Sequence, residues 1–374
     1  MARVILAMSG GVDSSVAADL LLRDGHEVIG VFMRHGEQSP VACSSGNGAS
    51  LPILERPDHK QGCCTASDAE DGRRVADRLG IPFFALNLQT EFQRIIDYFI
   101  QEYSVGRTPN PCVQCNNWIK FGKLFEYADS VGAEYVATGH YARIAKDENE
   151  NFGLYRGVDD SKDQSYVLFG IQRQLLSRML LPVGEFRKTE IRARAEALGL
   201  LVASKKDSQE ICFVSQGKHG DFIRARRPGQ KTAGEIVTTA GQVVGNHDGI
   251  ESFTIGQRRG LAVAMGEPYF VVRIEPETNR VVIGPKDALA QCEVIAKGAN
   301  WLTAPPTKPF RCQAMIRYNS PATAAWCFPS EALDSSEFRV VFDAPRDGIA
   351  PGQAVVCYEN DRTLGGGWIV AGAK

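Results

Sequence analysis

The sequence predicts an α/β protein in which a parallel-sheet domain is followed by two small, mainly β domains, the last a β-barrel. Three observations support this prediction. Short apolar runs alternate with helical patterns over the first half of the chain, which is typical of strands joined by crossover helices. After Cys212 short β runs are separated by Gly, Pro and Asn, which favours antiparallel barrels. A glycine-rich turn directly follows the first apolar run, at the sheet edge where such domains bind ligands.

Each element of the first domain follows from its local pattern. The expected strands are apolar runs bounded by polar or turn residues: Arg3–Met8, Val28–Met33, Phe83–Leu88 and Tyr135–Thr138. The expected helices carry apolar residues at helical spacing: Ser14–Arg23, Asp68–Leu79, Glu91–Tyr103, Trp118–Ser130, Gln164–Leu181 and Lys188–Leu198. A Gly/Ser/Pro-rich stretch without periodicity, 36–61, is expected to form a long loop or lid near the binding edge.

The β-rich half is expected to divide again. Its strands are the runs Glu235–Val237, Tyr269–Ile274, Arg280–Ile283, Gln313–Tyr318, Phe338–Phe342 and Ala354–Tyr358. We expect domains at 1–212, 213–288 and 289–374, which agrees with a length of 374 residues at about 150 residues per domain.

The composition is that of an ordinary globular protein. Hydrophobic residues make up 44% and charged residues 23%, which excludes a disordered, collagen-like or coiled-coil chain. No apolar run approaches the roughly 18 residues that cross a bilayer, and Val4–Met8 is too short for a signal peptide. We therefore expect a cytoplasmic protein without a membrane partner. A net charge of −2 argues against a non-specific nucleic-acid binder but leaves room for a local basic patch.

The turn after the first strand, Ser9 to Ser15, reads SGGVDSS. Its glycines allow a ligand to approach the backbone, and the following helix N-terminus offers N–H groups to an anion. It lacks the lysine of the GxxxxGK[ST] loop. The Asp13 carboxylate would repel phosphates unless it caps the helix or approaches Mg²⁺, so the sequence implies a metal. We expect nucleotide binding here, with adenine against Met33; the alternatives are a capped turn and a core methionine.

Three cysteines have surroundings that favour reactivity. Cys112 and Cys115 form a CxxC pair in a proline-containing loop, and Cys115 is expected just before a helix, which would lower its thiol pKa. Lysines at 205 and 206 favour a thiolate on Cys212. A zinc or redox turn is the alternative for the CxxC pair, although a zinc ribbon would need a second such pair.

Several motifs occur together and in order: SGGVDSS (9–15), TPNPCVQCN (108–116), ATGHYAR (137–143), KDQSY (162–166), KKDSQEICF (205–213), IGQRRGL (255–261), RY (317–318), PGQ (351–353) and LGGGWI (364–369). With them the chain resembles, over nearly its whole length, the tRNA-specific 2-thiouridylases of the PP-loop ATP pyrophosphatases. The resemblance implies an adenine nucleotide hydrolase-like first domain that uses ATP and Mg²⁺. It also implies a tRNA substrate with uridine at the wobble position, and an upstream sulfur donor that is a cysteine desulfurase or a relay protein.

The same resemblance assigns residues. The implied ATP site comprises Ala7, Met8, Ser9, Gly10, Gly11, Val12, Asp13, Ser14, Met33 and Gly139. The implied catalytic pair is Cys115, the nucleophile, and Cys212, the persulfide carrier. The stretch that meets the target base corresponds to Asn110, Pro111 and Cys112. The implied tRNA contacts are His140, Lys162, Asp163, Gln164, Arg317, Tyr318 and Gln353.

The implied reaction is adenylation of the uridine C2 oxygen with release of pyrophosphate, then sulfur transfer from a cysteine persulfide with release of AMP. It would leave a Cys115–Cys212 disulfide. Many family members have Asp where this chain has Cys112, so Cys112, Cys115 and Cys212 offer the alternative of a [4Fe–4S] cluster. Two other classes stay open: a synthetase acting on a small metabolite, which has no need of the cysteines, and a non-catalytic RNA-binding protein, which has no need of SGGVDSS.

Overall fold

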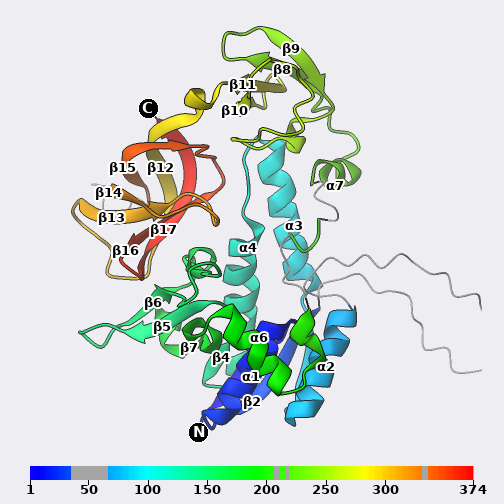
Figure 1. Ribbon diagram of the computed structural model, residues 1–374, viewed down its shortest axis with the longest axis vertical. Helices are drawn as coiled ribbons and strands as arrows, with labels where there is room; N and C mark the ends of the chain where they lie inside the picture. The colour runs from blue at the N-terminus through cyan, green and yellow to red at the C-terminus, as the bar shows by residue number, and fades with distance from the viewer. Residues whose placement is uncertain (35–65, 206–210, 215–218, 331–335, 374) are drawn as a thin grey trace, which may run out of the picture.

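The computed structural model describes residues 1–34, 66–205, 211–214, 219–330 and 336–373. Figure 1 shows three regions: a lower α/β region that contains the N-terminus, a small sheet at the top and a barrel that contains the C-terminus. The long helix α3 runs upward from the α/β region toward the small sheet. The loop expected at 36–61 lies outside the described residues.

The first region is built on a five-stranded sheet of order β3-β2-β1-β4-β7 whose strand pairings are all parallel. Its strands are β1 (Arg3–Ala7), β2 (Glu27–Arg34), β3 (Phe83–Asn87), β4 (Tyr135–Ala137) and β7 (Met179–Leu180). The predicted parallel sheet is therefore confirmed. Strand order reverses at β1, since β2 and β3 lie on one side and β4 and β7 on the other. The carboxyl ends of β1 and β4 thus border the crevice in which sheets of this kind bind ligands.

Helices cover both faces of this sheet. Neighbouring β1 residues alternate between two hydrophobic cores, Ile5 in one and Leu6 in the other, as the two-residue period of a strand requires. The first core is closed by α3 (Gln89–Ser104) and α5 (Leu124–Ser130), and the second by α1 (Val12–Arg23), α2 (Ala66–Leu79) and α6 (Lys188–Ala197).

Two helix predictions need correction. The segment Gln164–Leu181 forms the short 3-10 helices η2 (Ser165–Leu168) and η3 (Arg173–Arg178), followed by β7. Side-chain amides occupy its carbonyl groups: Asn116 Nδ2 donates to Val167 O at 2.9 Å, and Asn300 Nδ2 donates to Phe169 O at 2.6 Å. These carbonyls therefore accept hydrogen bonds from distant side chains instead of from the backbone N–H groups of an α-helix.

The helix expected from Trp118 begins earlier, at Pro111. It runs as α4 (Pro111–Gln114), the π-helix η1 (Cys115–Lys123) and α5 without a break. The remaining 3-10 helices are η4 (Pro182–Glu185), η5 (Leu201–Ser204), η7 (Ile250–Ser252) and η8 (Lys286–Leu289). None of the helices in the described part of the chain has the length and apolarity that crossing a membrane demands.

The second region contains α7 (His219–Arg226) and a four-stranded sheet of order β10-β11-β8-β9. Its strands are β8 (Gly234–Thr238), β9 (Val243–His247), β10 (Phe270–Glu275) and β11 (Arg280–Gly284). The expected strands are present, but β8 and β11 pair in parallel, so this sheet is mixed rather than antiparallel.

The third region is a closed antiparallel barrel of six strands in the order β12-β15-β14-β13-β16-β17, with β17 pairing back to β12. They are β12 (Ala290–Trp301), β13 (Phe310–Met315), β14 (Thr323–Pro329), β15 (Phe338–Asp347), β16 (Ala354–Glu359) and β17 (Arg362–Ala373). The predicted barrel is confirmed. A hairpin from the first half of the chain, β5 (Ala142–Lys146) and β6 (Phe152–Arg156), extends this sheet along β17. No local sequence pattern indicated this hairpin.

Candidate functional site

The turn between β1 and α1 leads into a helix N-terminus without a side-chain cap. The N-cap of α1 is Gly11, which has no side chain to occupy the N–H groups of the first turn. The loop is closed on itself: Ser15 Oγ donates to Gly11 O at 2.8 Å, and Ser9 N donates to Ser14 Oγ at 3.2 Å. The helix N-terminus therefore opens at the carboxyl end of β1, where its dipole favours a negatively charged ligand.

Gly139 lies directly against this turn. A Cβ added to it would come within 2.7 Å of Ser14 N and 2.9 Å of Asp13 C, so only glycine fits. The structure thus brings the loop after β4 to the N-terminus of α1, on the other side of the crevice. Met33, at the end of β2, is 7% exposed and packs in the first core.

Asp13 has protein partners that sequence analysis missed. Lys188 Nζ, at the start of α6, contacts Asp13 Oδ1 and Oδ2 at 2.8 Å each, and Tyr141 Oη donates to Oδ1 at 2.7 Å. The ammonium neutralises the carboxylate in the first turn of α1. Asp13 therefore does not need a metal to offset its repulsion of phosphates, because Lys188 neutralises it. Tyr141 is held in turn, since its N–H donates to Gln164 Oε1 at 2.9 Å.

The cysteine loop is the beginning of a helix. Asn110 is its N-cap, accepting from Val113 N at 3.3 Å, and Pro111 occupies the first helical position. Cys112 is exposed in the first turn, and Cys115 lies in the next turn, partly buried. The expectation that Cys115 directly precedes a helix is wrong, and Cys112 is the thiol nearer to the helix N-terminus. The Asn-Pro pair was the sequence signal for this earlier start.

Helix α3 brings the two predicted catalytic cysteines to one core. Tyr98 of α3 packs edge-on against Trp118, three residues after Cys115, with 5.9 Å between ring centroids. Phe99 packs in the same way against Phe213, the neighbour of Cys212, at 5.1 Å. Both cysteine side chains are partly buried against the first core. Figure 1 shows α3 and α4 side by side.

The described residues hold no set of three or more His, Cys, Asp or Glu side chains placed to bind a metal ion. Cys112, Cys115 and Cys212 all belong to that part of the chain. Their present arrangement does not fit three ligands of one iron–sulfur cluster.

His140 is buried rather than presented to solvent. Its Nδ1 lies 2.7 Å from Thr138 Oγ1, and its Nε2 lies 3.4 Å from Lys120 Nζ. Burial lowers the pKa of His140 well below its ordinary value, and the Lys120 charge lowers it further. The ring is therefore neutral at physiological pH, packed beneath the loop that carries Gly139.

Two other predicted tRNA contacts hold their own loop together. Asp163 accepts from Gly157 N at 3.1 Å and from Ser165 Oγ at 2.8 Å. Gln164 holds Tyr141, as described above. Lys162, next to them, is partly exposed.

The remaining three predicted tRNA residues come from the barrel. Gln353 Nε2 donates to Thr108 O and Pro109 O at 3.1 Å each, which fastens the barrel to the chain entering the cysteine helix. Arg317 Nη2 donates to Ile255 O and to Gly348 O, both at 2.6 Å, and so joins the second and third regions.

Tyr318 is 36% exposed. Burial, followed by the charges of Asp163 and Cys112, raises the pKa of Tyr318 to about 12. The charges of Asp163 and Cys112 thus act on Tyr318, although the three residues are far apart in sequence.

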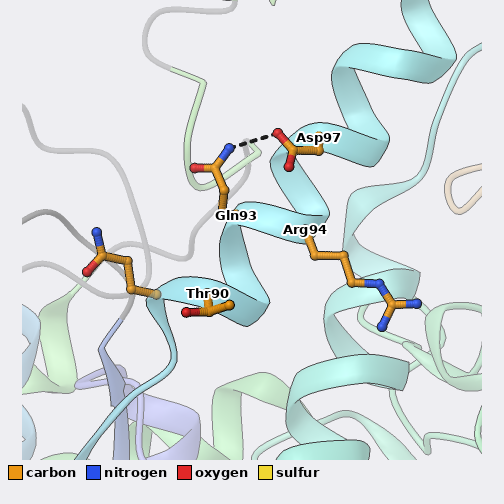
Figure 2. Close-up of a pocket in the computed structure, with 5 residues that line it drawn as sticks. Thr90, Gln93, Arg94 and Asp97 are labelled. Atoms are coloured by element: carbon orange, nitrogen blue, oxygen red, sulfur yellow. Dashed lines mark hydrogen bonds between the residues drawn. The ribbon is translucent and has the colours of Figure 1, made fainter.

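Figure 2 shows an open hollow on α3, lined by Gln89, Thr90, Gln93, Arg94 and Asp97. A hydrogen bond of 2.8 Å joins Gln93 Nε2 to Asp97 Oδ1 along one side of α3. None of the predicted site residues lines this hollow, so it is not part of the candidate site.

Comparisons with known proteins agree with this architecture. The family model described as "tRNA methyl transferase HUP domain" matches residues 2–216. The "tRNA methyl transferase PRC-barrel domain" matches 220–285, and the "Aminomethyltransferase beta-barrel domain" matches 291–369.

Curated relatives match over almost the full length. A protein of Rhodopirellula baltica named tRNA-specific 2-thiouridylase MnmA is 56% identical, covering 99% of this chain and 96% of its own. Proteins of the same name from Carboxydothermus hydrogenoformans and Solibacter usitatus are 45% and 44% identical, each covering 98% of this chain.

The parallel sheet and its glycine-rich loop before an uncapped helix define an ATP-utilising protein of the PP-loop class, with two β domains attached. Within that class, the identity over the whole chain decides the family. The chain belongs to the tRNA-specific 2-thiouridylases.

Proposed function

We propose that this protein transfers sulfur to C2 of the wobble uridine of tRNA at the expense of ATP. The observation that carries the proposal is the placement of Cys115 and Cys212 on one core through α3, in a chain whose first strand ends in an anion site. A small-metabolite synthetase would use the anion site alone. A non-catalytic RNA-binding protein would use neither feature.

The first step activates a poor electrophile. The uridine C2 oxygen attacks the α-phosphorus of ATP, the bond to pyrophosphate breaks, and C2 then carries AMP as a leaving group. The N–H groups at the start of α1, with the hydroxyls of Ser9 and Ser14, would stabilise the departing negative charge. Mg²⁺ would accompany ATP, held mainly by phosphates and water as this ion prefers.

The second step moves one sulfur atom. The terminal sulfur of a Cys212 persulfide attacks C2 and AMP leaves. The Cys115 thiolate then attacks Cys212 Sγ, the persulfide S–S bond breaks, and the sulfur stays on the base as a thiocarbonyl. A Cys115–Cys212 disulfide results, which a thiol reductant must open before the donor, a desulfurase or relay protein, reloads Cys212.

We assign the tRNA-facing roles by exposure. Cys112, Tyr318 and Lys162 are at least partly exposed and are candidates for direct contact with the anticodon loop. His140, Asp163, Gln164, Arg317 and Gln353 hydrogen-bond within the protein, and we assign them to holding the binding surface in shape.

Nucleoside mass spectrometry tests the function. Unmodified tRNA is incubated without oxygen with the protein, Mg-ATP and a persulfide-generating desulfurase, and 2-thiouridine should form only when ATP is present. Cys115→Ser and Cys212→Ser should each abolish the product while ATP binding is kept. Full activity in either variant contradicts the relay, and failure of the protein to bind tRNA contradicts the function.

The [4Fe–4S] alternative makes a different prediction. It requires iron and labile sulfide in protein purified without oxygen, and Cys112→Ser should then abolish activity as completely as Cys115→Ser. Absence of both iron and sulfide from an active preparation ends this alternative.

A further inference from the structure

Lys205 joins three segments at the edge of the nucleotide loop. Its Nζ donates to Gly10 O at 2.9 Å, to Asp68 Oδ1 at 2.7 Å and to Asp71 Oδ2 at 2.7 Å. Gly10 belongs to the loop after β1, the two aspartates belong to α2, and Lys205 follows η5. One ammonium therefore ties the loop, a helix and the start of the motif KKDSQEICF together.

Gly10 is held in a position where its carbonyl matters. Its φ of +69° is in the left-handed region, and a Cβ would lie 2.1 Å from Asp68 O, so only glycine can occupy this place. A trans peptide unit is planar, and its C=O and N–H point in opposite directions. A bond that fixes Gly10 O toward Lys205 therefore also fixes the direction of Gly11 N–H, at the N-cap of α1.

The charges in this cluster keep the bond in place. Burial by itself would lower the pKa of Lys205, but the hydrogen bonds and charges of Asp68 and Asp71 outweigh it and raise that pKa. Lys205 thus stays a cation, with its side chain 33% exposed and Asp68 only 10% exposed. A charge-assisted bond to a carbonyl in this setting is stronger than a neutral one.

We propose that Lys205 is a positioning residue for ATP: it orients the Gly10–Gly11 peptide toward the phosphates. This inference rests on the proposed function. It differs from a phosphate-contact role, because the Lys205 ammonium is engaged by the protein backbone and by two carboxylates.

The test measures ATP affinity without tRNA, beside the melting temperature, for Lys205→Met, Lys205→Arg and a matched control. Arg178→Met is that control, because Arg178 donates to Asp129 Oδ1, Glu134 O and Ala133 O and its side chain is 34% exposed. We expect Lys205→Met to weaken ATP binding by about tenfold, the effect of losing one charge-assisted hydrogen bond that orients the loop. Lys205→Arg should recover part of the loss, and Arg178→Met should bind ATP normally despite a comparable fall in melting temperature.

Normal ATP affinity in Lys205→Met would overturn the inference while leaving the proposed function intact. An equal loss in Arg178→Met would also overturn it, because general destabilisation would then explain the effect. If the methionine variant does not fold, Lys205→Gln is used, and it must show the same loss. Failure of the unaltered protein to bind ATP would instead refute the proposed function.

Discussion

Replacing Lys188 with methionine should impair both the stability of the α/β region and its affinity for ATP. Lys188 is 7% exposed, and its two 2.8 Å contacts neutralise Asp13, whose side chain is 29% exposed. Methionine keeps the aliphatic length of the side chain but leaves the Asp13 carboxylate with Tyr141 as the hydrogen-bond donor described above. An unneutralised negative charge then lies in the first turn of α1, beside the proposed phosphate site.

The size of the effect follows from the exposure of the pair. Removing one partner of a fully buried ion pair costs about 3–5 kcal/mol, whereas hydrogen bonds to charged groups contribute about 1.5–3 kcal/mol. Because Asp13 is partly exposed and keeps Tyr141, we expect a loss of about 2 kcal/mol, or about 5 °C in melting temperature. Two like unit charges about 4 Å apart repel by about 4 kcal/mol at an effective dielectric constant of about 20, so a phosphate near the bare carboxylate loses binding free energy. ATP affinity should therefore fall by at least about tenfold.

A double-mutant cycle separates charge from packing. ATP affinity is measured by titration calorimetry for Lys188→Met, Asp13→Asn and the double variant. Asp13→Asn removes the repelling charge and should bind ATP at least as well as the unaltered protein. The double variant should recover most of the affinity that Lys188→Met loses. If it binds no better than Lys188→Met, the electrostatic reasoning is refuted, and Lys188 acts through packing or through the ligand itself.

Three further outcomes are expected. The pKa of His140 is lowered in the folded protein, so the unfolded chain binds one more proton, and the free energy of unfolding should decline as pH falls below about 6.5 by at most about 1.4 kcal/mol per pH unit. Urea unfolding of His140→Asn should show a shallower decline with pH. Equal slopes in the two proteins would show that His140 does not cause this pH dependence. Gly139→Ala drives a methyl group against Ser14 N and should cost about 1–3 kcal/mol and most ATP binding, so a variant with normal calorimetric titration would contradict the close approach. Gln353→Ala removes both bonds to Thr108 and Pro109 and should reduce the thiolation rate while leaving ATP affinity unchanged, whereas an unchanged rate would show that this link is dispensable.

Local patterns predicted much of the fold. The runs that became β1 and β2 are mostly apolar segments next to glycine or charged residues, and short runs of this kind are consistent with buried strands. The run that became β3 formed the expected strand, although its side chains are partly or fully exposed. The strand–turn–helix at the start of the chain was equally visible, because SGGVDSS follows a strand without interruption. Where the prediction failed, side chains from distant segments decided the outcome. Asn116 and Asn300 donate hydrogen bonds to carbonyl groups of the segment Gln164–Leu181, which was expected to be a helix. No residue within that segment indicates these contacts.

The contacts that Lys188 and Lys205 make at the site could not be predicted from the sequence for the same reason. Lys188 meets Asp13 across 175 positions and Lys205 meets Gly10 across 195, and neither lysine stands in a motif that indicates its partner. The hairpin β5–β6 was missed because its strands alternate apolar and charged residues only weakly and find their partner, β17, near the end of the chain.

The hairpin β5–β6 has a consequence for recombining this protein with its relatives. Leu154 and Tyr155 pair with Thr363 and Arg362, and Arg362 Nη2 donates to Asp147 Oδ2 at 2.8 Å in the hairpin turn. A chimera that exchanged only the last third of the chain would take β17 from a relative and keep β6 from this protein. The two strands would then pair although their sequences did not evolve together. The exchangeable unit is the barrel together with residues 142–156, although the two pieces are encoded far apart.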